Sequence, residues 1–173
     1  MTTHIEDAKA IAQNTILSID LVEDGVLRRS AEVEMERHRA LSDLLHTNAF
    51  QLNTDHTKDH SSTGYHLVLK IAQNQLQVDV QDAAYTSLEV ISINLRGFKK
   101  LIKDYFLMCE SFYRFAKSGQ THKIEAVDMA RRGLHNEGAA LLQRKLAKYA
   151  ACDLNTARQL FTLICVLHIR IAV

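Results

Sequence analysis

The chain has 173 residues, of which 47% are hydrophobic and 24% are charged, a composition typical of one globular domain, which we place at residues 1–173. Its 21 basic and 20 acidic side chains leave a formal charge of +1, which argues against a surface built throughout for nucleic acid or membranes. No run reaches the roughly 18 apolar residues of a membrane span. The N-terminus shows no signal peptide, so we expect a cytoplasmic protein.

The N-terminal part is predicted to hold an extension, one strand and one helix. Residues 1–13 form the extension, within which 5–13 has the spacing of a short amphipathic helix. Residues 15–22 alternate between apolar and polar side chains, which predicts a strand. Ser30 is placed to cap a helix that runs to about His46, with glutamates near its start that favour the helix dipole.

The middle of the chain is predicted to form a loop and then a sheet. Residues 53–64 are the one segment of low hydrophobicity and predict a flexible loop. Three strands follow, at 65–72, 76–80 and 87–95. Each strand has one apolar face and one polar face, which is typical of an antiparallel sheet with one side on the core.

From Phe98 onward the chain is predicted to be helical, apart from a short extended link at 150–152. The first helix ends at Ser118-Gly119 and the second covers 122–148. The third, at 154–169, is apolar nearly all round and is expected to be buried. We therefore predict an α+β fold: an antiparallel sheet of about four strands, one helix after the first strand, and three C-terminal helices packed on the sheet with the last one central.

The helix at 122–148 carries charged residues within its apolar stripe. At about 100° per residue, Arg131 and His135 fall within about 60° of Asp128, and Arg132 flanks the same face. A solvated cluster would instead lie on the opposite face, with Glu137. Charges that leave water need partners, and Asp128 is placed to pair with Arg132 or His135. Two interpretations follow: a buried network that fixes helix packing, or a functional site.

Two features predict what surrounds this charged face. Gly133 and Gly138 each cost about 1 kcal/mol relative to alanine inside a helix, so we expect a neighbour or a ligand to approach the backbone closely. The helix that starts at Ser30 presents Glu34, Arg37 and His38 as near neighbours, and these side chains are candidate partners for the charged face.

Neither a metal site nor a cofactor motif is predicted. Cys109, Cys152 and Cys165 are far apart and lack metal-binding spacing, and the first and last of them lie in apolar helical runs as inert core residues. His56 and His60 have helical spacing, but they lie in the predicted loop, where chance explains them better than a metal site. No glycine-rich phosphate loop or zinc motif is present.

Several segments resemble a known family. These are ERHRALSDLL at 36–45, KDYFLMCESFYR at 103–114, IEAVDMARRGLHNEG at 124–138 and DLNTARQLFTLICVLH at 153–168. In this order they resemble uncharacterised protein family 0262, which groups small alphaproteobacterial proteins of unknown function. The resemblance covers about the last three-quarters of the chain, from Glu32 onward. It supplies neither catalytic residues nor a substrate, and the cofactor is unknown.

Two functions compete. We prefer a non-enzymatic binding or regulatory module with a protein partner, in which the charged cluster serves the fold, because no known catalytic motif is present. The alternative is a small enzyme or sensor in which Arg131 and Arg132 bind a phosphate- or carboxylate-bearing ligand. In that case Asp128 would orient His135 for proton transfer. Cys109 would act as a nucleophile only if His135 lay beside it.

A third function is nucleic-acid binding through a local basic patch. Lys99, Lys100 and Lys103 crowd the start of one helix, where cations oppose the helix dipole and an anion would be favoured. The near-zero net charge weighs against this function. Whether the chain is an enzyme therefore depends on the cluster: a site predicts a concave pocket beside it, whereas a structural network predicts satisfied side chains and no cavity.

Overall fold

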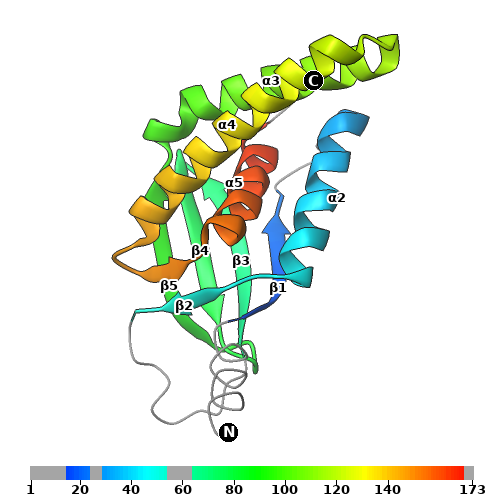
Figure 1. Ribbon diagram of the computed structural model, residues 1–173. Coiled ribbons are helices and arrows are strands. Elements are labelled where there is room, and N and C mark those ends of the chain that lie inside the picture. The colour runs from blue at the N-terminus through cyan, green and yellow to red at the C-terminus, as the bar shows by residue number, and fades with distance from the viewer. Residues whose placement is uncertain (1–14, 24–28, 54–63, 170–173) are drawn as a thin grey trace, which may run out of the picture.

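The computed structural model describes residues 15–23, 29–53 and 64–169. The predicted extension at 1–13 and the predicted loop, apart from its first and last residues, lie outside the described residues. A sheet forms one layer and helices cover one of its faces (Figure 1). The elements are β1 (Ile16–Val22), α2 (Ala31–His46), β2 (Phe50–Leu52), β3 (Tyr65–Ala72), β4 (Gln75–Gln81), β5 (Ser87–Asn94), a 3-10 turn (Arg96–Phe98), α3 (Lys99–Ser118), α4 (Thr121–Leu146), β6 (Ala150–Cys152) and α5 (Leu154–His168).

The main sheet has the strand order β1-β3-β4-β5. The pairs β3–β4 and β4–β5 are antiparallel, as predicted, whereas β1 runs parallel to β3, with Ile19 opposite Leu67. The parallel pair arises because α2 lies between the two strands and returns the chain to the end at which β1 began. The α+β prediction is confirmed, with a mixed rather than a purely antiparallel sheet.

Local signals account for most element boundaries. Ser30 and Asp153 cap α2 and α5, and each side chain accepts a hydrogen bond from the backbone N–H three residues later. Gly119 has φ of 72° and ends α3 in the left-handed conformation that glycine adopts without strain. Gln73 and Asn74 also have positive φ, as a tight hairpin turn between β3 and β4 requires.

A second, two-stranded sheet joins β2 to β6. The predicted extended link at 150–152 is β6, and it pairs antiparallel with β2, Phe50 lying opposite Cys152. β2 was not predicted, because three residues are too few to show an alternating pattern. This small sheet connects the segment after α2 to the segment before α5, and so brings these two helices together.

Helix α5 lies at the centre of the helical layer, as predicted. Its residues are buried almost continuously from Thr156 to Leu167, between the sheet, α4 and α2. Ile164 of α5 and Leu142 of α4 meet Leu67 of β3 in the core that helices and sheet share. Burial on all sides explains why α5 is apolar around its whole circumference.

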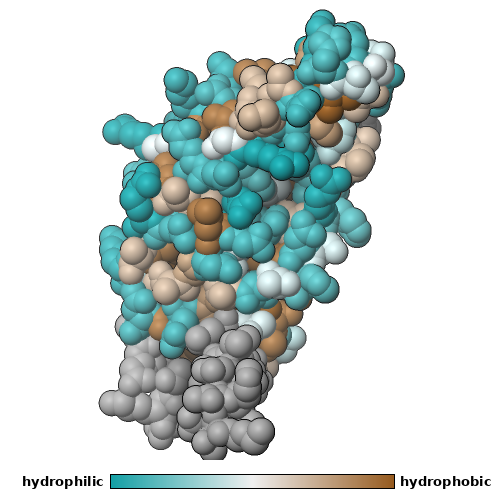
Figure 2. All heavy atoms as spheres, viewed as in Figure 1, coloured by the Kyte–Doolittle hydropathy of each residue, from teal (hydrophilic) through white to brown (hydrophobic). Residues whose placement is uncertain are grey.

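Hydrophilic residues cover most of the face shown in Figure 2, with isolated apolar side chains among them. The exposed apolar residues are spread over several elements, for example Met35 on α2, Val90 on β5 and Met129 on α4. Within the described part of the chain, no helix combines the length and the apolar character needed to cross a membrane.

Candidate functional site

The charged face of α4 points toward the other helices, as the sequence predicts. The side chains of Asp128 and Arg131 are only 20% and 15% exposed, and His135 is half-buried. Arg132 differs, because its side chain is 74% exposed at the edge of this face. Asp128 joins the two arginines: its Oδ1 lies 2.7 Å from Nη2 of Arg131, and its Oδ2 lies 2.9 Å from Nε of Arg132.

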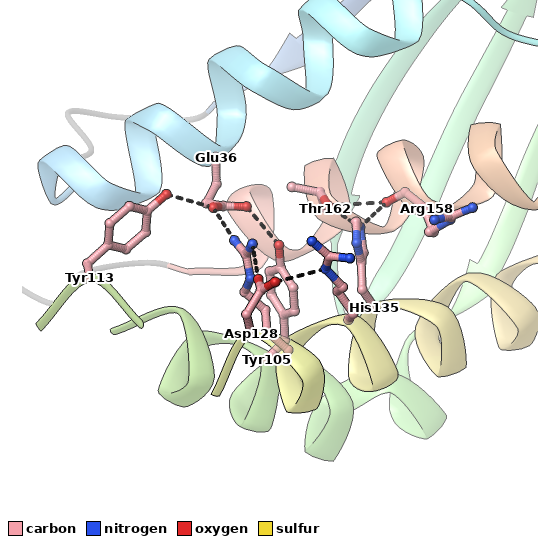
Figure 3. Close-up of polar contacts among 9 residues, drawn as sticks. Glu36, Tyr105, Tyr113, Asp128, His135, Arg158 and Thr162 are labelled. Atoms are coloured by element: carbon pink, nitrogen blue, oxygen red, sulfur yellow. Dashed lines mark hydrogen bonds and ion pairs between the residues drawn. The ribbon is translucent and has the colours of Figure 1, made fainter. Parts of the chain in front are cut away.

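Glu36 of α2 is the partner that the charged face meets (Figure 3). It is only 6% exposed. Its Oε1 accepts hydrogen bonds from the hydroxyl of Tyr113 at 2.8 Å and from Nη1 of Arg131 at 3.2 Å, and its Oε2 accepts one from the hydroxyl of Tyr105 at 2.8 Å. We call Glu36, Tyr105, Tyr113, Asp128 and Arg131 the polar network. It connects α2, α3 and α4.

Glu36 was not predicted as a partner of the charged face, whereas its neighbours Glu34, Arg37 and His38 were. Glu34 and Arg37 form ion pairs with residues just before α2, and His38 is exposed. A signal was available, because Glu36 stands on the buried stripe of α2 that also includes Val33, Ala40 and Leu44. A charged residue at a stripe position is the same pattern that singled out the face on α4.

Arg131 is held on three sides. Beyond its two carboxylate partners, its guanidinium group lies 4.5 Å from the centre of the Phe112 ring, a cation–π contact. Burial acts to lower the pKa of Arg131, but the hydrogen bond to Asp128 and the charge of Glu36 outweigh it and raise the pKa. Arg131 therefore stays charged and paired, and little of its binding capacity is left for a ligand.

His135 contacts α5 and not Asp128. Its Nε2 lies 2.8 Å from the backbone oxygen of Arg158 and 2.8 Å from Oγ1 of Thr162. A carbonyl oxygen only accepts, so Nε2 carries the proton and donates it. Burial lowers the pKa of His135, which keeps the ring neutral near pH 7. The expected Asp128–His135 pair does not form, because the carboxylate of Asp128 is engaged by the two arginines.

The lowered pKa of His135 predicts a loss of stability in acid. In the unfolded chain the ring titrates near 6.5, so below that pH the unfolded state binds more protons than the folded state. The stability that depends on a neutral His135 is fully present above about pH 6.5 and is lost as the pH falls toward the pKa of His135 in the folded state. Between pH 8 and 5.5 we expect the melting temperature to fall less in His135→Gln than in wild type, measured by circular dichroism.

The control for this experiment is His38→Gln, which changes an exposed histidine of α2. Glutamine at 135 keeps an N–H that can reach the backbone oxygen of Arg158, so loss of the titrating ring is the main difference. Equal pH dependence in wild type and both variants would show that His135 is not the group responsible.

The remaining candidates are dispersed. Cys109 is buried, and burial raises the pKa of its thiol to about 12, so it stays protonated instead of forming the thiolate a nucleophile needs. Lys99, Lys100 and Lys103 are exposed at the start of α3. The pair His56 and His60 lies outside the described residues, and among those described no group of three or more potential ligands could hold a metal ion.

Two hollows flank Glu36. The larger is a groove of about 520 Å³ between α2 and α3, lined by apolar side chains such as Val33 and Phe106 together with charged ones such as Glu110 and Lys117. The smaller, which we call the α2–α4 pocket, has a volume of about 110 Å³ and is lined by Arg131, Arg132 and His135 together with residues of α2 and α5. Glu36 belongs to both linings, so its side chain separates the two hollows.

These features define a class of protein: an α+β domain in which a mixed sheet carries a helical layer, with a buried polar network and a small pocket among its helices. The chain belongs to the uncharacterised protein family UPF0262, whose model matches residues 13–170. The resemblance noted from Glu32 onward is confirmed, and the match extends further toward the N-terminus.

Relatives in this family cover nearly the whole chain. A UPF0262 protein of Paramagnetospirillum magneticum is 44% identical over 155 residues, which is 90% of this chain and 96% of the relative. A UPF0262 protein of Rhodospirillum rubrum is 41% identical over 166 residues, which is 96% of this chain and 99% of the relative. A UPF0262 protein of Erythrobacter litoralis is 39% identical over 160 residues, which is 92% of this chain and 99% of the relative. No solved structure matches the chain significantly. The names of these relatives state no ligand and no reaction.

Proposed function

We propose that this protein is a non-enzymatic binding module and that its ligand occupies the α2–α4 pocket. The observation that carries the proposal is the pocket itself, which lies where three residues singled out from sequence, Arg131, Arg132 and His135, come together. Asp128, Arg131 and His135 have partners within the protein, as a structural network requires, but such a network alone has no need of the hollow beside them. Its volume of about 110 Å³ suits a small polar group and not a whole cofactor.

Within this pocket the four candidate residues have different roles. Asp128 positions both arginines, and Arg131 ties the wall formed by α4 to Glu36 on α2. His135 fixes α4 against α5. Arg132 is the residue left to contact the ligand, because it is mostly exposed and only its Nε is used by Asp128. A rigid wall with one free cationic group is suited to binding.

Binding is favoured over catalysis because the reactive groups near the pocket are already engaged. A general acid or base must be free to release or accept a proton at the reacting atom. The Nε2 proton of His135 is held by a backbone oxygen, and the hydroxyl of Tyr105 is held by Glu36. Burial raises the pKa of Tyr105 far above its usual range, so its hydroxyl keeps its proton.

A thermal-shift screen tests the proposal. Wild type and Arg132→Ala are screened against nucleotides, sugar phosphates, carboxylic acids, amino acids and divalent metals. A ligand present at 100 times its dissociation constant stabilises by about 2.7 kcal/mol, which corresponds to roughly 5–10 °C in a chain of this size. We expect at least one compound to raise the melting temperature of wild type and to lose that effect in Arg132→Ala.

Arg144→Ala is the matched control, because Arg144 is an exposed arginine of the same helix that does not line the pocket. The hit should stabilise this variant as it stabilises wild type. The proposal fails if no compound shifts wild type, or if every hit acts equally on Arg132→Ala. Conversion of a hit to product by wild type but not by His135→Gln, followed by NMR, would replace the binding module with an enzyme.

A further inference from the structure

Two arginines whose guanidinium groups have unused nitrogen atoms line the α2–α4 pocket, one from α2 and one from α4. Arg39 belongs to α2, is exposed, and makes no hydrogen bond or ion pair with any described residue. Arg132 belongs to α4 and pairs with Asp128 through Nε only. The terminal nitrogens of both groups are therefore available to a ligand that enters between the two helices.

The other charges around the pocket are largely neutralised by one another. Glu36 is paired with Arg131 and also accepts two tyrosine hydroxyl groups. Asp128, which adjoins the pocket, is shared by Arg131 and Arg132. Asp43 is the one lining carboxylate with no ion pair among the described residues. The buried ring of His135 adds no positive charge near pH 7. With Asp128 included, three arginines and three carboxylates balance in charge, so the pocket offers a ligand the free N–H donors of its guanidinium groups and no excess of positive charge.

The size of the pocket limits what these guanidinium groups can hold. A water molecule takes about 30 Å³ in the liquid, so about 110 Å³ accepts a group the size of a few waters. A single tetrahedral oxyanion is of this size, and the planar fork of an arginine matches its oxygens with two parallel hydrogen bonds. The side chain of Gln159 on α5 also lines the pocket and offers a neutral donor.

We propose that the ligand of the α2–α4 pocket is a phosphate group on a small molecule, held between Arg39 and Arg132. The group bridges α2 and α4, and the rest of the molecule lies outside the pocket. This inference rests on the binding function proposed above. It adds Arg39 as a ligand-binding residue and excludes Arg131, whose nitrogens are taken by Glu36 and Asp128.

Isothermal titration with inorganic phosphate tests the proposal, using the full chain at constant ionic strength, with sodium acetate as the comparison anion. We expect wild type to bind phosphate more tightly than acetate. Arg39→Ala and Arg132→Ala should each weaken phosphate binding by about tenfold or more, because each removes charge-assisted hydrogen bonds. Arg39→Lys should retain part of the affinity, and Arg144→Ala should bind as wild type does. Circular dichroism confirms that each variant is folded.

Four other outcomes would contradict the proposal of a small molecule that binds through its phosphate group. No binding of phosphate to wild type overturns it, and so does equal binding by wild type and both alanine variants. If the thermal-shift screen gives a ligand without phosphate that needs Arg132 but not Arg39, the binding function stands and the phosphate proposal falls. Vesicles of phosphatidic acid separate the two sources of a phosphate group: co-sedimentation that depends on both arginines would assign the site to a lipid headgroup and overturn the small molecule.

Discussion

Replacing Glu36 with alanine is expected to lower the free energy of unfolding by about 3–5 kcal/mol. The substitution removes the carboxylate that Tyr105, Tyr113 and Arg131 share, and it leaves a mostly buried guanidinium group with one partner, Asp128. It also joins the two hollows that Glu36 separates. In a chain of this size the melting temperature should fall by roughly 6–20 °C. Urea unfolding followed by circular dichroism measures the loss.

Two controls separate the charge from its hydrogen bonds. Tyr113→Phe removes a single hydrogen bond to the carboxylate. Because Tyr113 is only half-buried, the free energy of unfolding should fall by at most about 1.5–3 kcal/mol. The double variant Glu36→Leu with Arg131→Met replaces the buried pair by apolar side chains of similar size, so it should recover most of the stability lost in Glu36→Ala. A Glu36→Ala protein as stable as wild type would show that the polar network does not hold α2 to α3 and α4.

Gly138→Ala and Gly133→Ala are expected to change stability in opposite directions. A Cβ at Gly138 would lie 2.4 Å from the ring of Phe161, which is fully buried in α5, so α4 would have to move away from α5. Such overpacking costs about 1–3 kcal/mol. At Gly133 a Cβ meets nothing within 4 Å, and alanine should stabilise the helix by about 1 kcal/mol.

The comparison of these two glycines is made by thermal and urea unfolding of both single variants. Because the substitution is the same and both sites lie in α4, differences in helix propensity cancel. Two variants of equal stability would contradict the close approach of α4 to α5. Phe161→Leu combined with Gly138→Ala tests the cause: a smaller side chain at 161 should relieve part of the cost of the alanine.

The sequence predicted three of the four site residues on the inward face of α4, but it did not identify what they face. The stripe of α4 placed Asp128, Arg131 and His135 correctly because a helix has a fixed period. The partners were misjudged because Glu36, 95 positions before Arg131, belongs to another helix. Helix period alone does not say which positions of α2 and α4 meet.

The roles within the site also depend on distance and not on residue type. Two arginines and one histidine stand in the seven residues that follow Asp128, and only the tertiary structure shows that it binds the arginines. His135 is drawn to the backbone of α5, a contact that no pattern in α4 predicts. Arg39 and Arg132 line the same pocket only because the fold brings α2 to the same side of the sheet as α4 and α5.

By itself the sequence determined the helices and main strands of the described residues, the cap at Ser30, the helix end at Gly119 and the burial of α5. These features follow from local spacing, from capping residues and from apolar periodicity, which act over a few neighbouring positions. Only the tertiary structure decided the parallel pairing of β1 with β3, the choice of Glu36 as the buried partner, and the pocket between Arg39 and Arg132. Each of these depends on how elements distant in the chain pack together, because a cavity or a buried ion pair exists only where their surfaces meet.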